Sequence, residues 1–490
     1  MVRFWSLSTQ PGGLYPDEAA FGLSALRLLT VPGYHPLFFD INGGLGAPFT
    51  YLLAAVFKVF QSSVFTLRAT AAGVGIAGVI ATYVATRRFG RAAALLAMGW
   101  TAGSLWMIAI SRDGFENILT VAFGALALAA MLRWGDRPGR ATAVIAGVAI
   151  ALGLWTYQPL KLLPLLAILW LLWIRARDRD RFKSVLATWP WALAAFAVVA
   201  APMIVTAITD ASGYFGRAAS VSAFYVGAAS PDSYPVHVLR TVGMFLFTGD
   251  PNQRHDVNEL PLLGPLLFIP FALGIWRCWR HRDDHGHALV LLGLVVFLLP
   301  PLLATEGFAP HFLRSLGLAP FVAASVGLGC VEAVDLVRRF APRLSGVDPS
   351  DIARIGWAIC GLAVLGVGVA STVTYVNRPI EDRFAPFTFA DVALAGAAVN
   401  NATDGGPSTL LILDSYDALD VQFLDAGRAP TIVDPMHAVG NAAVYSLVVA
   451  PSIADIAAAV GAPLAAQAHV VATDPGGTPV AFEVVPEPTG

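Results

Sequence analysis

Ten long apolar segments constrain most strongly what this chain of 490 residues can fold into. Most of them approach the roughly 20 residues that an α-helix needs to cross a bilayer, and the shorter ones extend into neighbouring polar residues. Because 56% of the chain is hydrophobic and only 13% is charged, the sequence predicts a mostly α-helical protein that crosses a membrane many times. The predicted spans are residues 69–86, 92–110, 118–132, 141–155, 160–174, 186–208, 260–276, 288–304, 312–334 and 355–375.

Positive charge gathers in alternate loops between these spans. Five loops hold 18 of the 31 lysine and arginine residues, namely residues 87–91, 133–140, 175–183, 277–282 and 338–354. An excess of basic residues marks cytoplasmic loops, so this set is predicted to face the cytoplasm. The other loops, which carry charges of both signs, are then extracytoplasmic. The expected location is a bacterial-type inner (plasma) membrane.

An acidic pair, Asp17-Glu18, follows Pro16 near the start of the chain. Residues 19–29 predict a short amphipathic helix, so both carboxylates fall in its first turn, where the helix dipole favours negative charge. The alternative is an ordinary acidic helix start without function. Residues 37–60 could form either a membrane span or a helix lying at the interface. Glycine and proline breaks favour the interfacial interpretation, which places the acidic pair outside the cell with the other polar loops.

The composition changes at about residue 378, which divides the chain into a membrane domain, residues 1–377, and a small soluble α/β domain, residues 378–490. The last predicted span leaves this domain extracytoplasmic. Asp414 and Asp434, at predicted strand ends, could bind a ligand or only cap turns. The predicted strands are residues 409–414, 430–434, 445–450, 468–472 and 480–485, with helices at 387–400, 416–426 and 453–464.

Several function classes lack their sequence signals. The three cysteines form neither a metal-ligand spacing nor a disulfide framework, and no phosphate-binding or dinucleotide fingerprint occurs. Residues 1–13 have no apolar core of the length that a cleavable signal peptide needs. The basic clusters lie in loops between membrane spans and do not form a surface for nucleic acid, so we expect no nucleic-acid partner.

Six short motifs in this order resemble the membrane glycosyltransferases of the C-type fold. The closest branch is the bacterial relatives of protein O-mannosyltransferases and of the aminoarabinose transferase of lipid A. The resemblance covers roughly residues 3–376, although the family has a spanning helix before the acidic loop and only 16 residues precede Asp17 here. The motifs are the acidic pair, His35-Pro36, Ile110-Ser111-Arg112, the 153–159 run with Leu163-Pro164, Gly249-Asp250 with Arg254-His255, and Pro310-His311-Phe312-Leu313-Arg314.

The resemblance implies an inverting transfer of a sugar from a polyprenyl phosphate to a protein, lipid or glycan acceptor. A general base must take the proton of the acceptor hydroxyl, and cations must stabilise the leaving phosphate. By match to the family motif, Asp17 is the predicted base and Glu18 supports it, through a hydrogen bond or a divalent metal whose ligands stay open. The remaining candidates, expected to bind substrate or lipid phosphate, are His35, Arg112, Tyr157, Lys161, Asp250, Arg254, His255, Glu306, His311 and Arg314.

For several of these residues, the alternative is a structural role without substrate binding. Arg112 and Lys161 could only reach toward lipid headgroups, and His35 could be a turn residue. A polytopic transporter or a flippase of lipid-linked sugars is the alternative function, but it should place ionisable residues at mid-depth within its spans. A structural or assembly protein gives no reason for clustered carboxylates and cations at one face.

Overall fold

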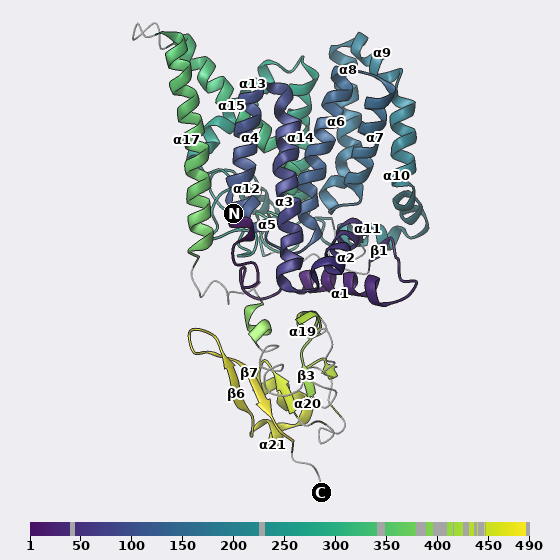
Figure 1. Ribbon diagram of the computed structural model, residues 1–490, viewed down its shortest axis with the longest axis vertical. Helices are drawn as coiled ribbons and strands as arrows, with labels where there is room; N and C mark the ends of the chain where they lie inside the picture. The colour runs from purple at the N-terminus through teal and green to yellow at the C-terminus, as the bar shows by residue number, and fades with distance from the viewer. Residues whose placement is uncertain are drawn as a thin grey trace.

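The computed structural model consists of a helical bundle and a small α/β region beyond one end of it (Figure 1). It describes residues 1–39, 45–224, 231–340, 348–378, 389–394, 409–414, 416–424, 431–435, 439, 445 and 447–486.

All ten predicted spans fall on helices of the bundle. Seven helical segments in the described ranges are long and apolar enough to cross a membrane, as expected for an integral membrane protein. α6 and α15 are enclosed by their neighbours, whereas α10 and α17 expose most of their apolar side chains, which suits contact with lipid. The bundle helices are α3 (Val64–Thr86), α4 (Arg91–Gly103) with α5 (Leu105–Ile110), α6 (Leu119–Asp136), α7 (Arg140–Leu154), α8 (Leu163–Arg177), α10 (Trp189–Thr209), α13 (Gly264–Arg280), α14 (His285–Leu303), α15 (Ala319–Phe340) and α17 (Pro349–Val376).

Four of the basic loops, residues 87–91, 133–140, 175–183 and 277–282, meet at one end of the bundle. Arg88, after α3, pairs with Asp136 of α6 at 2.8 Å and with Asp284, before α14, at 2.7 Å. Arg177 pairs with Asp283 in the same region. Figure 1 shows the N-terminal helix and the α/β region at the opposite end. The predicted separation of the two sets of loops is therefore present, while the assignment of the basic end to the cytoplasm stays a prediction.

Helix α1 (Pro16–Thr30) lies across the non-basic end of the bundle, beside α2 (Pro48–Phe60) (Figure 1). Their connection contains a two-residue antiparallel pair of strands, β1 (Phe38–Phe39) and β2 (Leu45–Gly46). With 13 residues, α2 is shorter than a membrane span. This arrangement agrees with the interfacial interpretation of residues 37–60.

Three buried arginines hold the N-terminal segment against the bundle through its carbonyl groups or those of α4. Arg3 donates to the carbonyls of Thr101 and Ala102. Arg112 donates to the carbonyls of Val2, Trp5 and Gln10, and Arg68 to those of Leu7, Pro11 and Gly13. Buried carbonyls need such donors, so this segment is fixed before α1 begins.

The α/β region contains one five-stranded sheet in the order β4-β3-β5-β7-β6. All five predicted strands are present, and the first three pair in parallel. Of the predicted helix 387–400, only residues 389–394 are described. The strands are β3 (Thr409–Ile412), β4 (Thr431–Val433), β5 (Leu447–Ala450), β6 (His469–Thr473) and β7 (Pro479–Val484), and the helices are α19 (Ala418–Leu424), α20 (Ile453–Val460) and α21 (Ala462–Ala465).

Helix α19 joins the α/β region to the bundle by packing on α1. Phe423 lies 96% buried between the two, with its ring stacked on Phe57 of α2 at 6.1 Å. A Cβ atom at Gly22 of α1 would lie only 2.3 Å from the Phe423 ring, so the glycine permits this close approach. The contact brings the α/β region directly over the acidic pair.

Candidate active site

The two carboxylates of the acidic pair have different environments, although they are adjacent in the first turn of α1. Glu18 is fully buried and forms a two-point ion pair with Arg68, at 2.9 Å for each contact. It also accepts the backbone N–H groups of Tyr15 at 3.1 Å and Gly114 at 2.5 Å. Asp17 is half-buried and lies at the surface where α19 packs.

Glu18 is held as a carboxylate despite its burial. Burial alone would raise the pKa of Glu18, but the charge of Arg68 and its hydrogen bonds outweigh this effect and lower the pKa. Arg68 was not among the residues that the motifs predicted for the site. The signal available in the sequence was one cation inside an otherwise apolar run, a position that usually requires a buried partner.

Arg254 comes from a distant loop and completes a buried charge cluster around Glu18. Its Nη2 atom lies 3.4 Å from Glu18 and 3.5 Å from Asp113, and its guanidinium carbon lies 3.5 Å from the ring centroid of Tyr15. The neighbouring carboxylates raise the pKa of Arg254 against the opposing effect of burial. Its Nη1 atom has no hydrogen-bond acceptor among the residues that the structure describes. The cluster thus offers one buried cationic N–H group for an additional acceptor.

Asp113 is the second carboxylate in contact with Arg254. It is 99% buried, and no described donor forms a hydrogen bond to either of its oxygens. Burial raises the pKa of Asp113 to about 6; Arg254 opposes the rise, and Glu18 adds to it. The sequence analysis gave this residue no family match, and its position in the cluster became visible only in three dimensions.

Asp17 accepts a hydrogen bond from a residue of the C-terminal region. The hydroxyl of Tyr416 donates to Asp17 Oδ1 at 2.9 Å across 399 positions of sequence. Burial and the negative charge of Asp17 raise the pKa of Tyr416, which keeps the hydroxyl protonated as a donor. The rings of Tyr15, Phe389 and Tyr416 surround this contact with centroid separations of 5.0–6.3 Å.

A second pair of opposite charges lies near Asp17. Lys161 interacts electrostatically with Glu116, and its Nζ atom lies 3.8 Å from the ring centroid of Tyr214. Glu116 is fully buried, and its carboxylate has no hydrogen-bond donor in the described ranges. It also interacts electrostatically with Asp17. Glu116 therefore lies within electrostatic range of both Lys161 and Asp17, while Arg254 contacts Glu18 directly.

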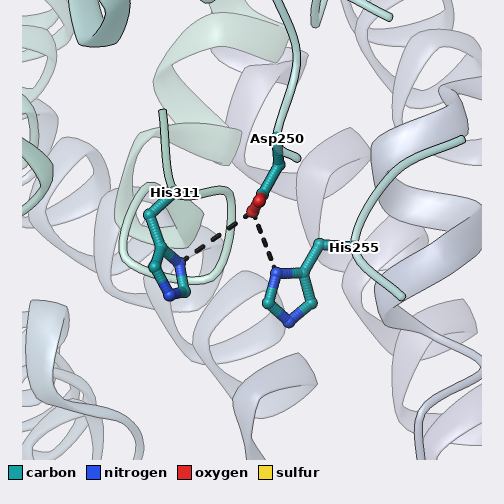
Figure 2. A group of neighbouring side chains, drawn as sticks. All are labelled: Asp250, His255 and His311. Carbon is teal, nitrogen blue, oxygen red and sulfur yellow. Dashed lines mark hydrogen bonds and ion pairs between the residues drawn. The ribbon is translucent and has the colours of Figure 1, made fainter. Parts of the chain in front are cut away.

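Asp250, His255 and His311 form a compact group beside this cluster (Figure 2). His255 Nδ1 lies 2.9 Å and His311 Nδ1 lies 4.0 Å from the same oxygen, Asp250 Oδ2. Asp250 Oδ2 also accepts the backbone N–H of Phe312 at 2.7 Å, which joins the two loops. The charge of His255 acts on Asp113, so the group adjoins the Arg254 cluster. Its donor atoms, all within 4.8 Å of one another, have the chemistry of a divalent-metal site.

The structure does not bring the other predicted site residues to Asp17 in this way. Arg112 is fully buried, and its Nη atoms donate to backbone carbonyls of the N-terminal segment. Arg314 donates to the carbonyls of Ala304 and Glu306 and pairs with the Glu306 carboxylate at 3.4 Å. His35 is exposed between α1 and β1, and Tyr157 is half-buried before η4 (Gln158–Leu162).

Comparison with known families shows which proteins this chain resembles. Residues 47–205 match the sequence model of the dolichyl-phosphate-mannose-protein mannosyltransferase family. The match runs from α2 through most of α10, which includes Arg68, Asp113, Glu116 and Lys161. The resemblance to C-type membrane glycosyltransferases that the motifs predicted is therefore confirmed.

Individual solved structures share the fold of this chain. ArnT from Cupriavidus metallidurans, in the apo state, superposes with a TM-score of 0.59 at 14% identity, covering 100% of this chain and 97% of ArnT. The same protein bound to undecaprenyl phosphate gives a TM-score of 0.58 at 14% identity, with the same coverage. No protein of curated function matches the sequence.

An archaeal relative shares the fold more distantly. The oligosaccharyltransferase AglB from Archaeoglobus fulgidus, in complex with an inhibitory peptide and a dolichol-phosphate, superposes with a TM-score of 0.52 at 15% identity. The alignment covers 99% of this chain and 71% of AglB. At these identities the likeness establishes the fold, which is the predicted mostly α membrane fold with a small C-terminal α/β region.

Proposed function

We propose that this protein transfers a sugar from a polyprenyl phosphate to a hydroxyl-bearing protein, lipid or glycan acceptor, at the extracytoplasmic face of the membrane. Among the similar structures, ArnT is bound to undecaprenyl phosphate and AglB is in complex with a dolichol-phosphate. A lipid phosphate of this kind suits a site at the end of an apolar bundle, where the isoprenoid chain can stay in the bilayer.

The observation that carries the proposal is that Glu18 and Asp17, although adjacent, have different hydrogen-bond partners and different burial. Glu18 is neutralised by Arg68 and saturated with hydrogen bonds, so its carboxylate has a structural role. Asp17 is half-buried at the rim and already accepts a hydroxyl hydrogen bond, from Tyr416. A general base must lie within hydrogen-bond reach of the hydroxyl that it deprotonates, and Asp17 has this geometry.

In the proposed reaction, the acceptor oxygen forms a bond to the anomeric carbon as its proton passes to Asp17. The bond between that carbon and the phosphate oxygen breaks with inversion, and its electron pair leaves with the polyprenyl phosphate. Arg254, with one N–H group lacking an acceptor among the described residues, and Lys161 are the cations proposed to stabilise the phosphate. Arg112 and Arg314 are proposed to position the loops around them.

A divalent metal ion is part of the proposal, held by Asp250, His255 and His311. Imidazole nitrogens and a carboxylate are ligands that zinc accepts. The His255 and His311 ring centroids lie 5.4 Å apart, so both imidazoles would be near enough to Asp250 to serve with it as ligands. Such an ion would supply positive charge beside the phosphate.

The experiment that tests the function is a donor panel. The purified protein in lipid nanodiscs is incubated with undecaprenyl phosphate linked to mannose, glucose or arabinose, together with an envelope extract as the acceptor source. Release of undecaprenyl phosphate from at least one donor, dependent on the protein, is the expected result. A transporter or a flippase would move the lipid-linked sugar between leaflets without releasing the lipid phosphate.

A further inference from the structure

The C-terminal α/β region reaches into the proposed active site, although neither Tyr416 nor Asp420 was a candidate from the sequence. Its Tyr416 hydroxyl lies on Asp17 Oδ1 at 2.9 Å, and Asp420 of α19 is fully buried close enough to Glu18 for their charges to interact. Phe423 anchors α19 between α1 and α2. These contacts come from successive turns of one segment, so the region is docked on the acidic pair at several points.

The chemistry of the Tyr416 contact resembles that of a bound acceptor. A hydroxyl donating to the proposed base at 2.9 Å has the same donor, acceptor and distance that an acceptor hydroxyl needs before it is deprotonated. Tyr416 is 38% exposed, so the contact lies at the rim, where a molecule from outside the membrane can arrive. The surrounding rings of Tyr15 and Phe389 provide flat apolar faces at this point.

We propose that the acceptor binds between α1 and residues 416–424, and that the Tyr416 hydroxyl occupies the position of the acceptor hydroxyl until the acceptor displaces it. This inference rests on the proposed function. Tyr416 is thus a positioning residue that keeps water from using Asp17 as a base. Aromatic faces at the entrance favour an acceptor whose hydroxyl is carried on a ring, such as a sugar residue of a glycan or glycolipid.

The consequence is a competition between transfer and hydrolysis. When water takes the place of the acceptor, its oxygen bonds to the anomeric carbon as its proton passes to Asp17. The bond from that carbon to the phosphate oxygen breaks, and the products are free sugar and polyprenyl phosphate. While Tyr416 donates to Asp17, a water molecule has to compete for that position. A Tyr416→Phe substitution removes the hydroxyl and keeps the ring packing, so it should favour hydrolysis without disturbing the fold.

The first test measures release of free sugar from the polyprenyl-phosphate sugar that the wild-type protein consumes, without any acceptor. Tyr416→Phe should raise this release about fivefold, as loss of one competing hydrogen bond implies. A second substitution, Asp17→Asn, should return release to background. Tyr234→Phe is the matched control, because Tyr234 is similarly exposed, at 47%, on α12 (Tyr234–Gly243). Unchanged hydrolysis by Tyr416→Phe in an active enzyme overturns the role of Tyr416.

The second test needs no turnover, so it separates failure of this inference from failure of the proposed function. Asp17→Cys is introduced in a Cys360→Ser background, where the remaining native cysteines, Cys278 and Cys330, are buried. The rate of modification by a small cationic thiosulfonate is measured with and without Tyr416→Ala. The inference predicts severalfold faster modification when Tyr416 is shortened. Equal rates would show that Tyr416 does not cover position 17, and would overturn it.

Discussion

Arg68 Nη2 lies 2.9 Å from Glu18 Oε2, and both side chains are at most 1% exposed. This contact ties the N-terminal turn of α1 to the first turns of α3. Removing one member of a buried ion pair leaves the other charge without compensation, which typically costs about 3–5 kcal/mol. Arg68→Met should therefore lower the unfolding temperature in detergent markedly, while Arg354→Met, at an ion pair with an 80% exposed arginine, should change it little. Equal unfolding temperatures for the two variants would contradict this structural role.

The sequence predicted the apolar helices well because their signal is local and strong. It also predicted the five strands of the C-terminal region and the acidic first turn of α1. Burial and charge pairing could not be predicted in the same way, because they depend on residues far apart in sequence. Arg68 and Tyr416 reach the acidic pair from 50 and 399 positions away, and only the packing of α3 and α19 brings them there.

Arg112 was predicted to bind phosphate from its place in a motif, and this stays a prediction. The structure uses its guanidinium to hold carbonyls of the N-terminal segment. A motif predicts the residue type and the end of the bundle at which it lies. It does not predict the acceptor, because a buried arginine can donate to backbone carbonyls or to a phosphate.

The sidedness of the two ends can be tested by cysteine labelling. His35 lies at the end with α1, and Lys183 lies at the basic end with its side chain 76% exposed. In the Cys360→Ser background, a membrane-impermeant maleimide added to intact cells should label His35→Cys and leave Lys183→Cys unlabelled until the cells are opened. Labelling of both positions in intact cells would contradict the predicted topology.

The buried carboxyl group of Asp420 is predicted to make the packing of the C-terminal region on the bundle depend on pH. Burial, with the added charge of Glu18, raises the pKa of Asp420 to about 9, against about 3.9 in an unfolded chain. Between these values the folded state binds the extra proton, so stability falls as the pH rises, by up to about 1.4 kcal/mol per pH unit. Asp420→Asn should flatten the decline of the unfolding temperature between pH 7 and pH 8. An unchanged slope would show that Asp420 does not carry this proton.

The proposed metal site predicts a stoichiometric ion that two substitutions remove. Elemental analysis of protein purified without chelator should find zinc or another divalent metal near one per chain. His255→Ala with His311→Ala should lose most of it, whereas His469→Ala, on a largely exposed histidine of β6, should keep it. Equal metal content in all three proteins would remove Asp250, His255 and His311 from consideration as ligands.

The central claim is that Asp17 acts as the general base of a polyprenyl-phosphate-dependent transfer. The most direct measurement compares release of undecaprenyl phosphate by wild-type protein, Asp17→Asn and a control, Asp351→Asn, in the presence of acceptor. Asp351 lies at the start of α17 with its side chain 53% exposed. Asp17→Asn should bind the donor normally but lose roughly a hundredfold or more in rate, while the control should match wild type. Transfer by Asp17→Asn at the wild-type rate would show that Asp17 is not the base.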